Sequence, residues 1–212
     1  MSGDEASAGA ASTGSAVSER AKREPGPQDQ RWDWVEASIW TDRMISALEN
    51  GVQGGKWYSL VDKAIRPATL EAAWLKVRAN KGAAGVEGVS VQRFEARSAD
   101  YLRELGQDLS ARVYCASAVR RVEIPKSGGK TRPLGIPTVK DRIVQTALKL
   151  TIEPIFEAEF RDGSYGFRPG RGAKDALREV DRLIKEGYTH VVDADLKSYL
   201  DLASQYPLVH AG

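Results

Sequence analysis

Apolar residues recur at helical spacing along residues 32–112, and this pattern predicts a region built mainly of helices. The segment TDRMISALENG at 41–51 places its apolar side chains on one face and stops at a glycine, so we expect a helix there. A longer helix is expected over 67–82, and helical spacing returns after Ser90 and over 98–111. The positions expected to face the core are Met44, Ile45, Leu48, Leu70, Trp74, Val77, Leu102, Leu105 and Leu109.

The pattern changes to alternation in the middle of the chain. Residues 118–125 and 131–137 read as two strands, and KSGGK between them reads as their turn. A long amphipathic helix is then expected over 138–160. Helices followed by a hairpin and a further helix predict a mixed α+β fold.

The last part of the chain combines a loop, a helix and a short strand. SYGFRPGRG at 164–172 contains too much glycine and proline for regular structure. Residues 173–187 predict a helix with one apolar face turned inward, and HVVDADL at 190–196 predicts a short buried strand. The inward positions expected in that helix are Ala176, Leu177, Val180 and Ile184.

Composition limits the class of protein. The chain has 212 residues, of which 42% are hydrophobic and 28% charged, as is ordinary for a soluble globular protein. Residues 1–31 are rich in alanine, serine, glycine and charge without a hydrophobic period, which predicts a disordered tail. No apolar run approaches the ~20 residues of a membrane span. Cys115 is the single cysteine, so we expect a cytoplasmic protein without disulfides or a membrane partner.

The net charge of +2 conceals an uneven distribution. Residues 112–149 contain nine lysines and arginines and two acidic residues, a local balance of +7. Such clustering is typical of proteins that bind phosphate-rich partners. A solvated charged surface gives the same pattern, so charge alone leaves both interpretations open.

Three short segments carry candidate chemistry, and the first is the predicted hairpin. Its glycine turn brings Lys126, Lys130 and Arg132 close together, where they could converge on phosphate groups. Arginine can hold a phosphate through two parallel hydrogen bonds, whereas lysine acts as a point charge. An ordinary solvated hairpin is the alternative.

The second segment is the loop at 164–172, where Tyr165 and Phe167 alternate with Arg168 and Arg171. Aromatic rings can stack on nucleic-acid bases while arginines hold the backbone. Equally, both rings could fill the core beneath a loop. The third segment is the predicted C-terminal strand with its aspartates. A carboxylate held at a strand end can bind the metal ions of phosphoryl transfer, although capping or solubility explains most such acids.

Together, and in this order, these segments resemble the beginning of a group II intron reverse transcriptase, the intron-encoded protein that also acts as a splicing maturase. The resemblance runs from Trp74 to Asp201. The motifs that carry it are GVEGVSVQRFE, RRVEIPKSGGKTRPLGIPTVKDRIVQTALKLTIEPIFEAEF, SYGFRPGRGAKDAL and VVDADLKSYLD. The resemblance implies the fingers of a right-hand polymerase followed by the start of the palm. The regions implied are a tail at 1–31, a helical N-terminal region at 32–112, fingers at 113–188, and a first palm strand with a divergent end at 189–212.

The resemblance also implies roles for individual residues. Lys126 and Arg132, with Lys130 as a helper, would cover the triphosphate of an incoming deoxynucleotide. Asp195 would be the catalytic carboxylate and would bind Mg²⁺ together with the backbone carbonyl of Leu196. The partners implied are group II intron RNA, or another RNA or DNA template. The positions expected along the RNA path are Arg120, Arg121, Arg142, Tyr165, Phe167, Arg168 and Arg171.

The resemblance ends abruptly near Asp201. Leu200 lies where the family normally has an aromatic residue beneath the nucleotide sugar, and the chain ends in LASQYPLVHAG. This ending has no counterpart to the family's second aspartate motif, thumb or maturase region, so we expect a truncated protein that does not polymerise DNA. A non-catalytic RNA-binding module and an inert product of a degraded gene copy are the alternatives.

Overall fold

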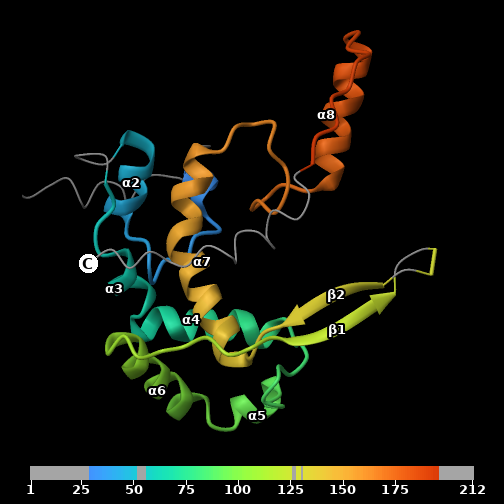
Figure 1. Ribbon diagram of the computed structural model, residues 1–212. Helices are drawn as coiled ribbons and strands as arrows, with labels where there is room; N and C mark the ends of the chain where they lie inside the picture. The colour runs from blue at the N-terminus through green and yellow to red at the C-terminus, as the bar shows by residue number, and fades with distance from the viewer. Residues whose placement is uncertain (1–28, 52–55, 126–127, 130, 196–212) are drawn as a thin grey trace, which may run out of the picture. The chain divides into compact units, whose positions relative to one another are not determined.

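The computed structural model describes residues 29–51, 56–125, 128–129 and 131–195 (Figure 1). These residues fold as helices and a two-stranded sheet, which confirms the mixed helix and strand class expected from the sequence. The chain forms two compact units that are divided between Phe160 and Arg161. In the part of the chain that the structure describes, no helix is long and apolar enough to cross a membrane.

The first unit consists of short helices around two longer ones, α4 and α7. Most lie where the hydrophobic spacing predicted them, whereas α3 and the 3₁₀ helix η1 were not expected. η1 begins within the segment expected as a tail, of which residues 1–28 lie outside the described part of the chain. The helices are η1 (Asp29–Trp32), α2 (Asp42–Asn50), α3 (Leu60–Ala64), α4 (Pro67–Ala79), α5 (Val91–Glu95), α6 (Ser98–Ser110) and α7 (Val139–Glu159).

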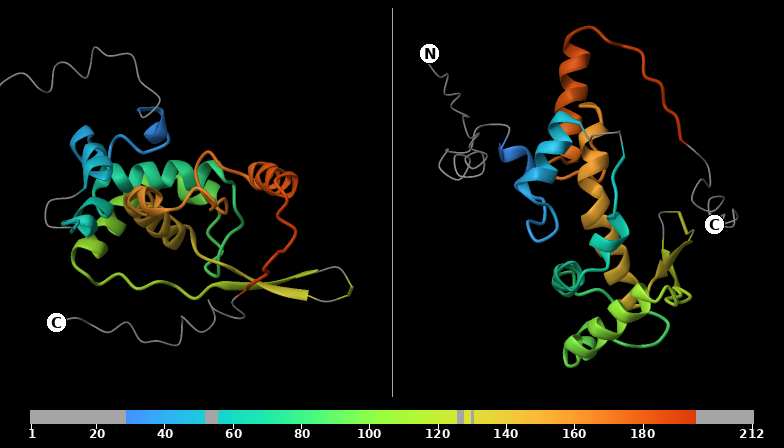
Figure 2. Two further views of the ribbon diagram at one scale, coloured as in Figure 1. Left: turned by 90° about the horizontal axis from the view of Figure 1, so that it is seen from above. Right: turned by 90° about the vertical axis from the view of Figure 1, so that its left-hand side faces the viewer.

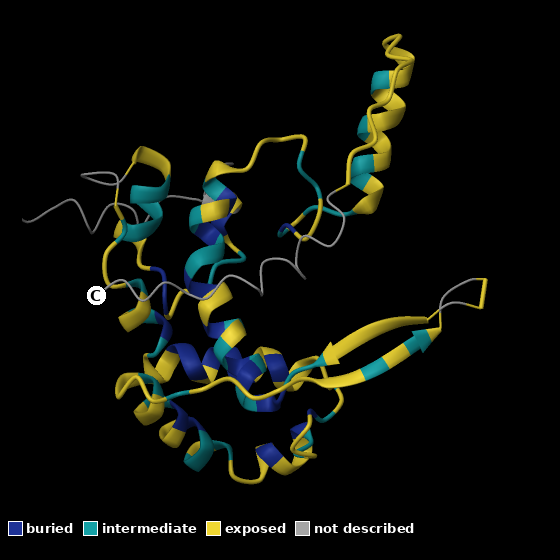
Figure 3. Cartoon of the chain, in the orientation of Figure 1, coloured by how far each residue is buried: buried dark blue, intermediate teal, exposed yellow. Residues whose placement is uncertain are grey.

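The core of this unit lies where α4 packs across α7, with α5 and α6 on the other side of α4 (Figures 1 and 2). Leu70, Trp74 and Val77 of α4 are buried, as their spacing predicted. They join Ile143 of α7 in one apolar cluster. Figure 3 shows the buried residues concentrated on these helices. Each fully buried side chain of this size contributes about 1.5–3 kcal/mol through the removal of apolar surface from water.

Aromatic residues tie the helices together. The rings of Trp74 and Phe94 lie 4.7 Å apart between centroids, and those of Phe94 and Tyr101 lie 4.9 Å apart. The indole nitrogen of Trp40 donates to the carbonyl oxygen of Leu150 at 3.1 Å, so a buried polar atom is satisfied. These contacts link α4, α5, α6 and α7 into one body.

Two helices of the first unit begin at a side-chain cap. The hydroxyl of Ser90 accepts from the backbone N–H of Arg93 at 3.2 Å at the start of α5. The hydroxyl of Thr138 accepts from the backbone N–H of Asp141 at 3.1 Å at the start of α7. Each bond satisfies a backbone donor that has no partner within its helix.

The expected hairpin is present as β1 (Arg120–Pro125) and β2 (Thr131–Ile136), which pair antiparallel. Arg120 lies opposite Ile136 at the base, and Ile124 lies opposite Arg132 near the turn. The hairpin extends away from the helices of its unit (Figures 1 and 2).

The second unit contains α8 (Ala173–Lys185), where the sequence predicted a helix. Our prediction that its apolar face turns inward is wrong. None of its residues is buried, and Leu177, Val180 and Ile184 are exposed (Figure 3). The amphipathic spacing is sufficient to form the helix, but burial of its apolar face requires a neighbouring element to cover it.

The strand expected at 190–196 is also not formed in its described part. Residues 189–195 have no regular secondary structure, and Val191 and Val192 are exposed at 91% and 92%. A strand takes its backbone hydrogen bonds from a neighbouring strand. Within the described residues β1 and β2 pair with each other, and neither pairs with this segment.

Candidate nucleic-acid interface

The register of the hairpin assigns its side chains to two faces. Directly paired residues share a face, and alternate residues along each strand return to it. Arg120 and Arg132 therefore lie on the same face, at its base and near its turn. Arg121 lies on the opposite face beside Glu123, whose carboxylate accepts from the guanidinium Nε at 2.9 Å.

Among the predicted phosphate-binding cations, Arg132 is the one that the structure describes. Its side chain is exposed on β2. Lys126 and Lys130 lie outside the described residues. In the turn between the strands, Gly128 and Gly129 have φ angles of 82° and 72°, in the left-handed region that favours glycine. The tight turn expected from KSGGK is thus present in the two described glycines.

Two further predicted RNA-binding arginines are bonded to backbone carbonyls at the base of the hairpin. Nε of Arg120 donates to the carbonyl oxygen of Ala84 at 3.0 Å. A guanidinium nitrogen of Arg142 donates to the carbonyl oxygen of Ala83 at 2.7 Å, and burial lowers the pKa of this guanidinium. Both arginines therefore hold the loop after α4 against the hairpin and α7. They remain predictions as RNA contacts.

A buried carboxylate fixes the start of α7. Asp141 is 4% exposed and accepts from the Thr138 hydroxyl at 2.6 Å and from the Ser117 backbone N–H at 3.3 Å. The Tyr114 hydroxyl donates to its other contacts' shared oxygen, Oδ1. Burial acts to raise the pKa of Asp141, but these hydrogen bonds outweigh it and the net pKa is lowered. The pKa of the Tyr114 hydroxyl is raised, first by burial and then by its bond to this carboxylate.

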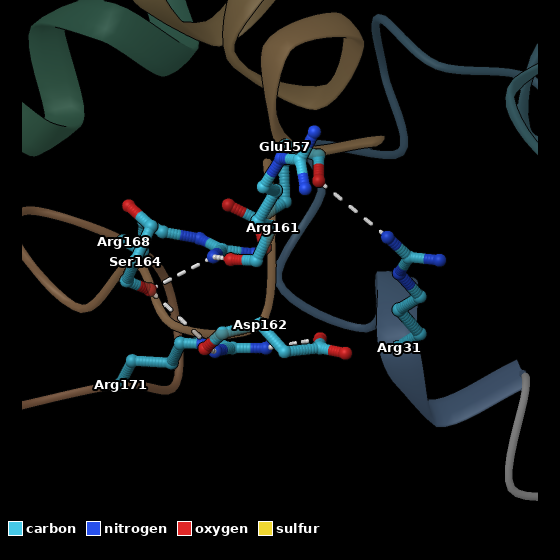
Figure 4. Close-up of polar contacts among 7 residues, drawn as sticks. All are labelled: Arg31, Glu157, Arg161, Asp162, Ser164, Arg168 and Arg171. Atoms are coloured by element: carbon cyan, nitrogen blue, oxygen red, sulfur yellow. Dashed lines mark hydrogen bonds and ion pairs between the residues drawn. The ribbon is translucent and has the colours of Figure 1, made fainter. Parts of the chain in front are cut away.

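The loop that contains SYGFRPGRG is held by two of its own arginines (Figure 4). Arg168 is 6% exposed, and one guanidinium nitrogen donates to the carbonyl oxygens of Arg161 at 2.7 Å and Ser164 at 2.8 Å. Arg171 donates to the carbonyl oxygen of Asp162 and pairs with its carboxylate at 3.3 Å. These guanidinium groups support the loop from within, and their predicted contact with RNA is untested.

The two aromatic residues of this loop differ in exposure. Tyr165 is partly buried, and the guanidinium of Arg171 lies 5.7 Å from the centroid of its ring. Phe167 is 104% exposed and has a φ angle of 56°. The sequence left base stacking and core filling open for both rings, and the structure shows that Phe167 does not fill a core.

The acidic residues at the C-terminal side are exposed and do not form a cluster. Asp193 and Asp195 are both exposed, while Leu196 and Leu200 lie outside the described residues. In the described part of the chain, no three histidine, cysteine, aspartate or glutamate side chains lie close enough together to hold a metal ion. The carboxylate of Asp195 is a chemically suitable Mg²⁺ ligand, but one carboxylate does not make a metal site.

Sequence reasoning missed the base of the hairpin. Gly85 packs directly against α7, because a Cβ atom there would lie 2.7 Å from the Cα of Thr138 and 2.9 Å from the carbonyl oxygen of Pro137. The glycines in GAAGVEG were a usable signal for such close backbone approach. The Thr138–Asp141 spacing, which is that of a capping box, was a second one.

Comparison with known proteins finds relatives over most of this region. Residues 124–203 match the family described as reverse transcriptase (RNA-dependent DNA polymerase). Protein YkfC of Escherichia coli K12 is 41% identical over 152 residues, which is 69% of this chain and 40% of that protein. The group II intron-encoded protein LtrA of Lactococcus lactis is 33% identical over 146 residues, or 68% of this chain and 24% of that protein.

A shorter similarity links the chain to plant proteins. Nuclear intron maturase 2 of Arabidopsis thaliana is 45% identical over 62 residues, which is 29% of this chain and 8% of that protein. The chain thus spans less than half the length of each of these relatives. These similarities confirm the resemblance expected from the sequence motifs.

Proposed function

From the relationship of this chain to group II intron-encoded reverse transcriptases, we propose that residues 113–188 form the fingers of such an enzyme and bind RNA. The hairpin is the centre of the proposed interface. Nine lysines and arginines against two acidic residues at 112–149 favour a phosphate-rich partner over this stretch. Residues 32–112 form the helical N-terminal region of the same proposal.

The observation that carries the proposal is the position of Arg132. Its exposed guanidinium lies near the turn of a hairpin that projects from the helices of its unit (Figure 1). The base of that hairpin is fixed through Arg120, which lies on the same face and bonds to the carbonyl of Ala84 at 3.0 Å. An anchored hairpin with an exposed arginine near its tip is suited to hold phosphate groups.

Two contacts are proposed for this hairpin. Arg132, together with Lys126 and Lys130, would cover the triphosphate of a deoxynucleotide, since three cations at one turn match its negative charge. The RNA strand would lie along the same segment and reach the loop at 164–172. Arg121 and Arg142 belong to this interface as secondary contacts, because the first is paired with Glu123 and the second is bonded to Ala83.

Asp195 is proposed as a Mg²⁺ ligand of the first palm strand, together with the carbonyl oxygen of Leu196, and Leu200 as the residue beneath the nucleotide sugar. Mg²⁺ would supply charge stabilisation for phosphoryl transfer. The described residues offer Asp195 no companion ligands in a cluster, so we assign no reaction step to it. DNA synthesis and splicing assistance are proposed for complete proteins of this kind, and RNA binding for this chain.

Titration of a short fluorescent single-stranded RNA at several salt concentrations tests this proposal. We expect affinity to fall with salt, and Arg132→Ala to reduce the slope of log affinity against log salt by about 0.7, the value for one phosphate contact on a single strand. Arg121→Ala is the matched control on the opposite face and should change the slope less. Absence of binding by the unmodified chain at low salt, or equal effects of both variants, would contradict the proposal.

A further inference from the structure

Phe167 is the residue of the 161–172 loop whose presentation calls for an explanation beyond folding. Its side chain is 104% exposed, although phenylalanine is among the residues most often buried. Its backbone has a φ angle of 56°, in the left-handed region that costs free energy for a residue with a side chain of this size. A strained backbone that displays an apolar ring to solvent is typical of a binding residue rather than a packing residue.

The loop beneath this ring is held in place by charged groups. Arg168 is 6% exposed and bonds at 2.7 Å and 2.8 Å to the carbonyl oxygens of Arg161 and Ser164. Arg171 pairs with Asp162 at 3.3 Å (Figure 4). Two arginines thus fix the backbone on both sides of Phe167, so that the ring is displayed from a braced loop.

We propose that Phe167 stacks on an unpaired base of bound RNA, and that Arg168 and Arg171 act as positioning residues that hold the loop for this contact. The inference rests on the proposed RNA binding and assigns base contact to one of the loop's two rings. Tyr165 is partly buried beneath the Arg171 guanidinium, with 5.7 Å between that group and the ring centroid. It supports the loop rather than contacting the strand.

The surroundings of Phe167 favour RNA over a protein partner. Residues 161–172 contain three arginines and one acidic residue, and a guanidinium that donates to carbonyl oxygens keeps its positive charge. A protein-docking surface usually presents a contiguous apolar patch. Phe167 instead stands between glycine and arginine in the sequence, as a single ring in a basic loop. A single ring with adjacent cations is suited to stacking on bases of any sequence.

The test compares a short single-stranded RNA with an otherwise identical strand of abasic riboses, each titrated with the full chain. Phe167→Gly removes the ring and suits the left-handed backbone, so the loop is retained. We expect it to weaken binding of the normal strand by about 5- to 150-fold, the equivalent of ~1–3 kcal/mol for one stacked base. It should cause no further loss on the abasic strand. Phe167→Trp should preserve affinity for the normal strand.

Leu177→Ala is the matched control, because Leu177 is an exposed apolar residue of the same unit, and its RNA affinity should be unchanged. Phe167→Asn, which also tolerates a left-handed backbone, should repeat the loss seen with glycine. Equal losses on normal and abasic strands would overturn base stacking. So would unchanged RNA affinity, including a case in which Phe167→Gly instead alters self-association measured by sedimentation. If Arg132→Ala still weakened binding in that case, the proposed function would stand and this inference alone would fail.

Discussion

The Tyr114 hydroxyl donates a hydrogen bond to Oδ1 of Asp141, which lies 27 positions further along the chain. The same carboxylate accepts from the Ser117 backbone N–H at 3.3 Å and from the Thr138 hydroxyl at 2.6 Å. The hairpin leaves the helices after Ser117 and returns just before Thr138. One buried carboxylate therefore joins the two segments that lead into and out of the proposed RNA-binding hairpin.

Asp141→Asn should lower the free energy of unfolding by about 1–3 kcal/mol at neutral pH, the usual cost of leaving a buried polar partner unsatisfied. An amide offers one acceptor oxygen where the carboxylate offers two, so the Thr138 and Tyr114 hydroxyls cannot both keep their bonds. Urea unfolding measures the change. Asp100→Asn is a control, because Asp100 is partly exposed and pairs with Arg103 on the surface of α6, and it should change stability little.

The stability of the unmodified chain should fall in acid in a way that depends on Asp141. Its pKa in the folded state lies below the ordinary 3.8, so the unfolded state binds more protons between these two values. The stabilisation from this group is therefore complete above the unfolded pKa and is lost as pH falls through the folded pKa. Urea unfolding between about pH 5 and pH 2 should show a smaller loss for Asp141→Asn than for the unmodified chain. Parallel pH curves for the two proteins would contradict this assignment.

Tyr114→Phe should destabilise the first unit by about 1.5–3 kcal/mol, the range for a hydrogen bond to a charged group. The ring remains, so the loss reports the hydroxyl. A double-mutant cycle with Asp141→Asn should give a coupling free energy of about 0.5–3 kcal/mol, because both changes remove the same bond. Additive losses would show that the two groups act independently.

Gly85→Ala and Gly106→Ala should change stability in opposite directions. A methyl group at Gly85 would lie 2.7–2.9 Å from backbone atoms of Thr138 and Pro137, which cannot move aside as a flexible side chain can. We expect a loss of about 1–3 kcal/mol, as for other overpacked sites. At Gly106, within α6, the methyl group would meet the Leu70 side chain at 3.5 Å, an ordinary contact. The gain in helix propensity should then stabilise the protein by about 0.5–1 kcal/mol. Thermal unfolding of both variants checks the two signs.

The helices of the first unit and the hairpin could be predicted from sequence because their signals are local. Leu70, Trp74 and Val77 specify one face of α4, and Thr138 supplies the cap of α7. The contacts at the base of the hairpin could not be predicted in this way. They join Arg120 and Arg142 to backbone carbonyls of the loop after α4, and hydrophobic periodicity carries no information about which carbonyl a side chain will meet.

The C-terminal expectations failed for the complementary reason. Periodicity in α8 and the valines of HVVDADL state that a surface is apolar, but they do not supply the element that covers it. The structure therefore retains the helix of α8, whose hydrogen bonds are internal, and lacks the strand at 189–195, whose bonds require a neighbour. Composition likewise could not separate Tyr165 from Phe167, because exposure depends on the bonds made by Arg168 and Arg171.

Arg168→Lys should loosen the 161–172 loop without unfolding α8. The guanidinium bridges two carbonyl oxygens through one nitrogen at 2.7 Å and 2.8 Å and keeps a fixed planar geometry, which an ammonium group does not reproduce. Tryptic cleavage after Arg161 and Arg171, followed by mass spectrometry, should be faster in this variant because the open form is more populated. Arg178→Lys is the matched control, since its 2.6 Å pair with Asp175 lies on the surface of α8. Equal cleavage rates at both sites in the two variants would show that Arg168 does not brace the loop.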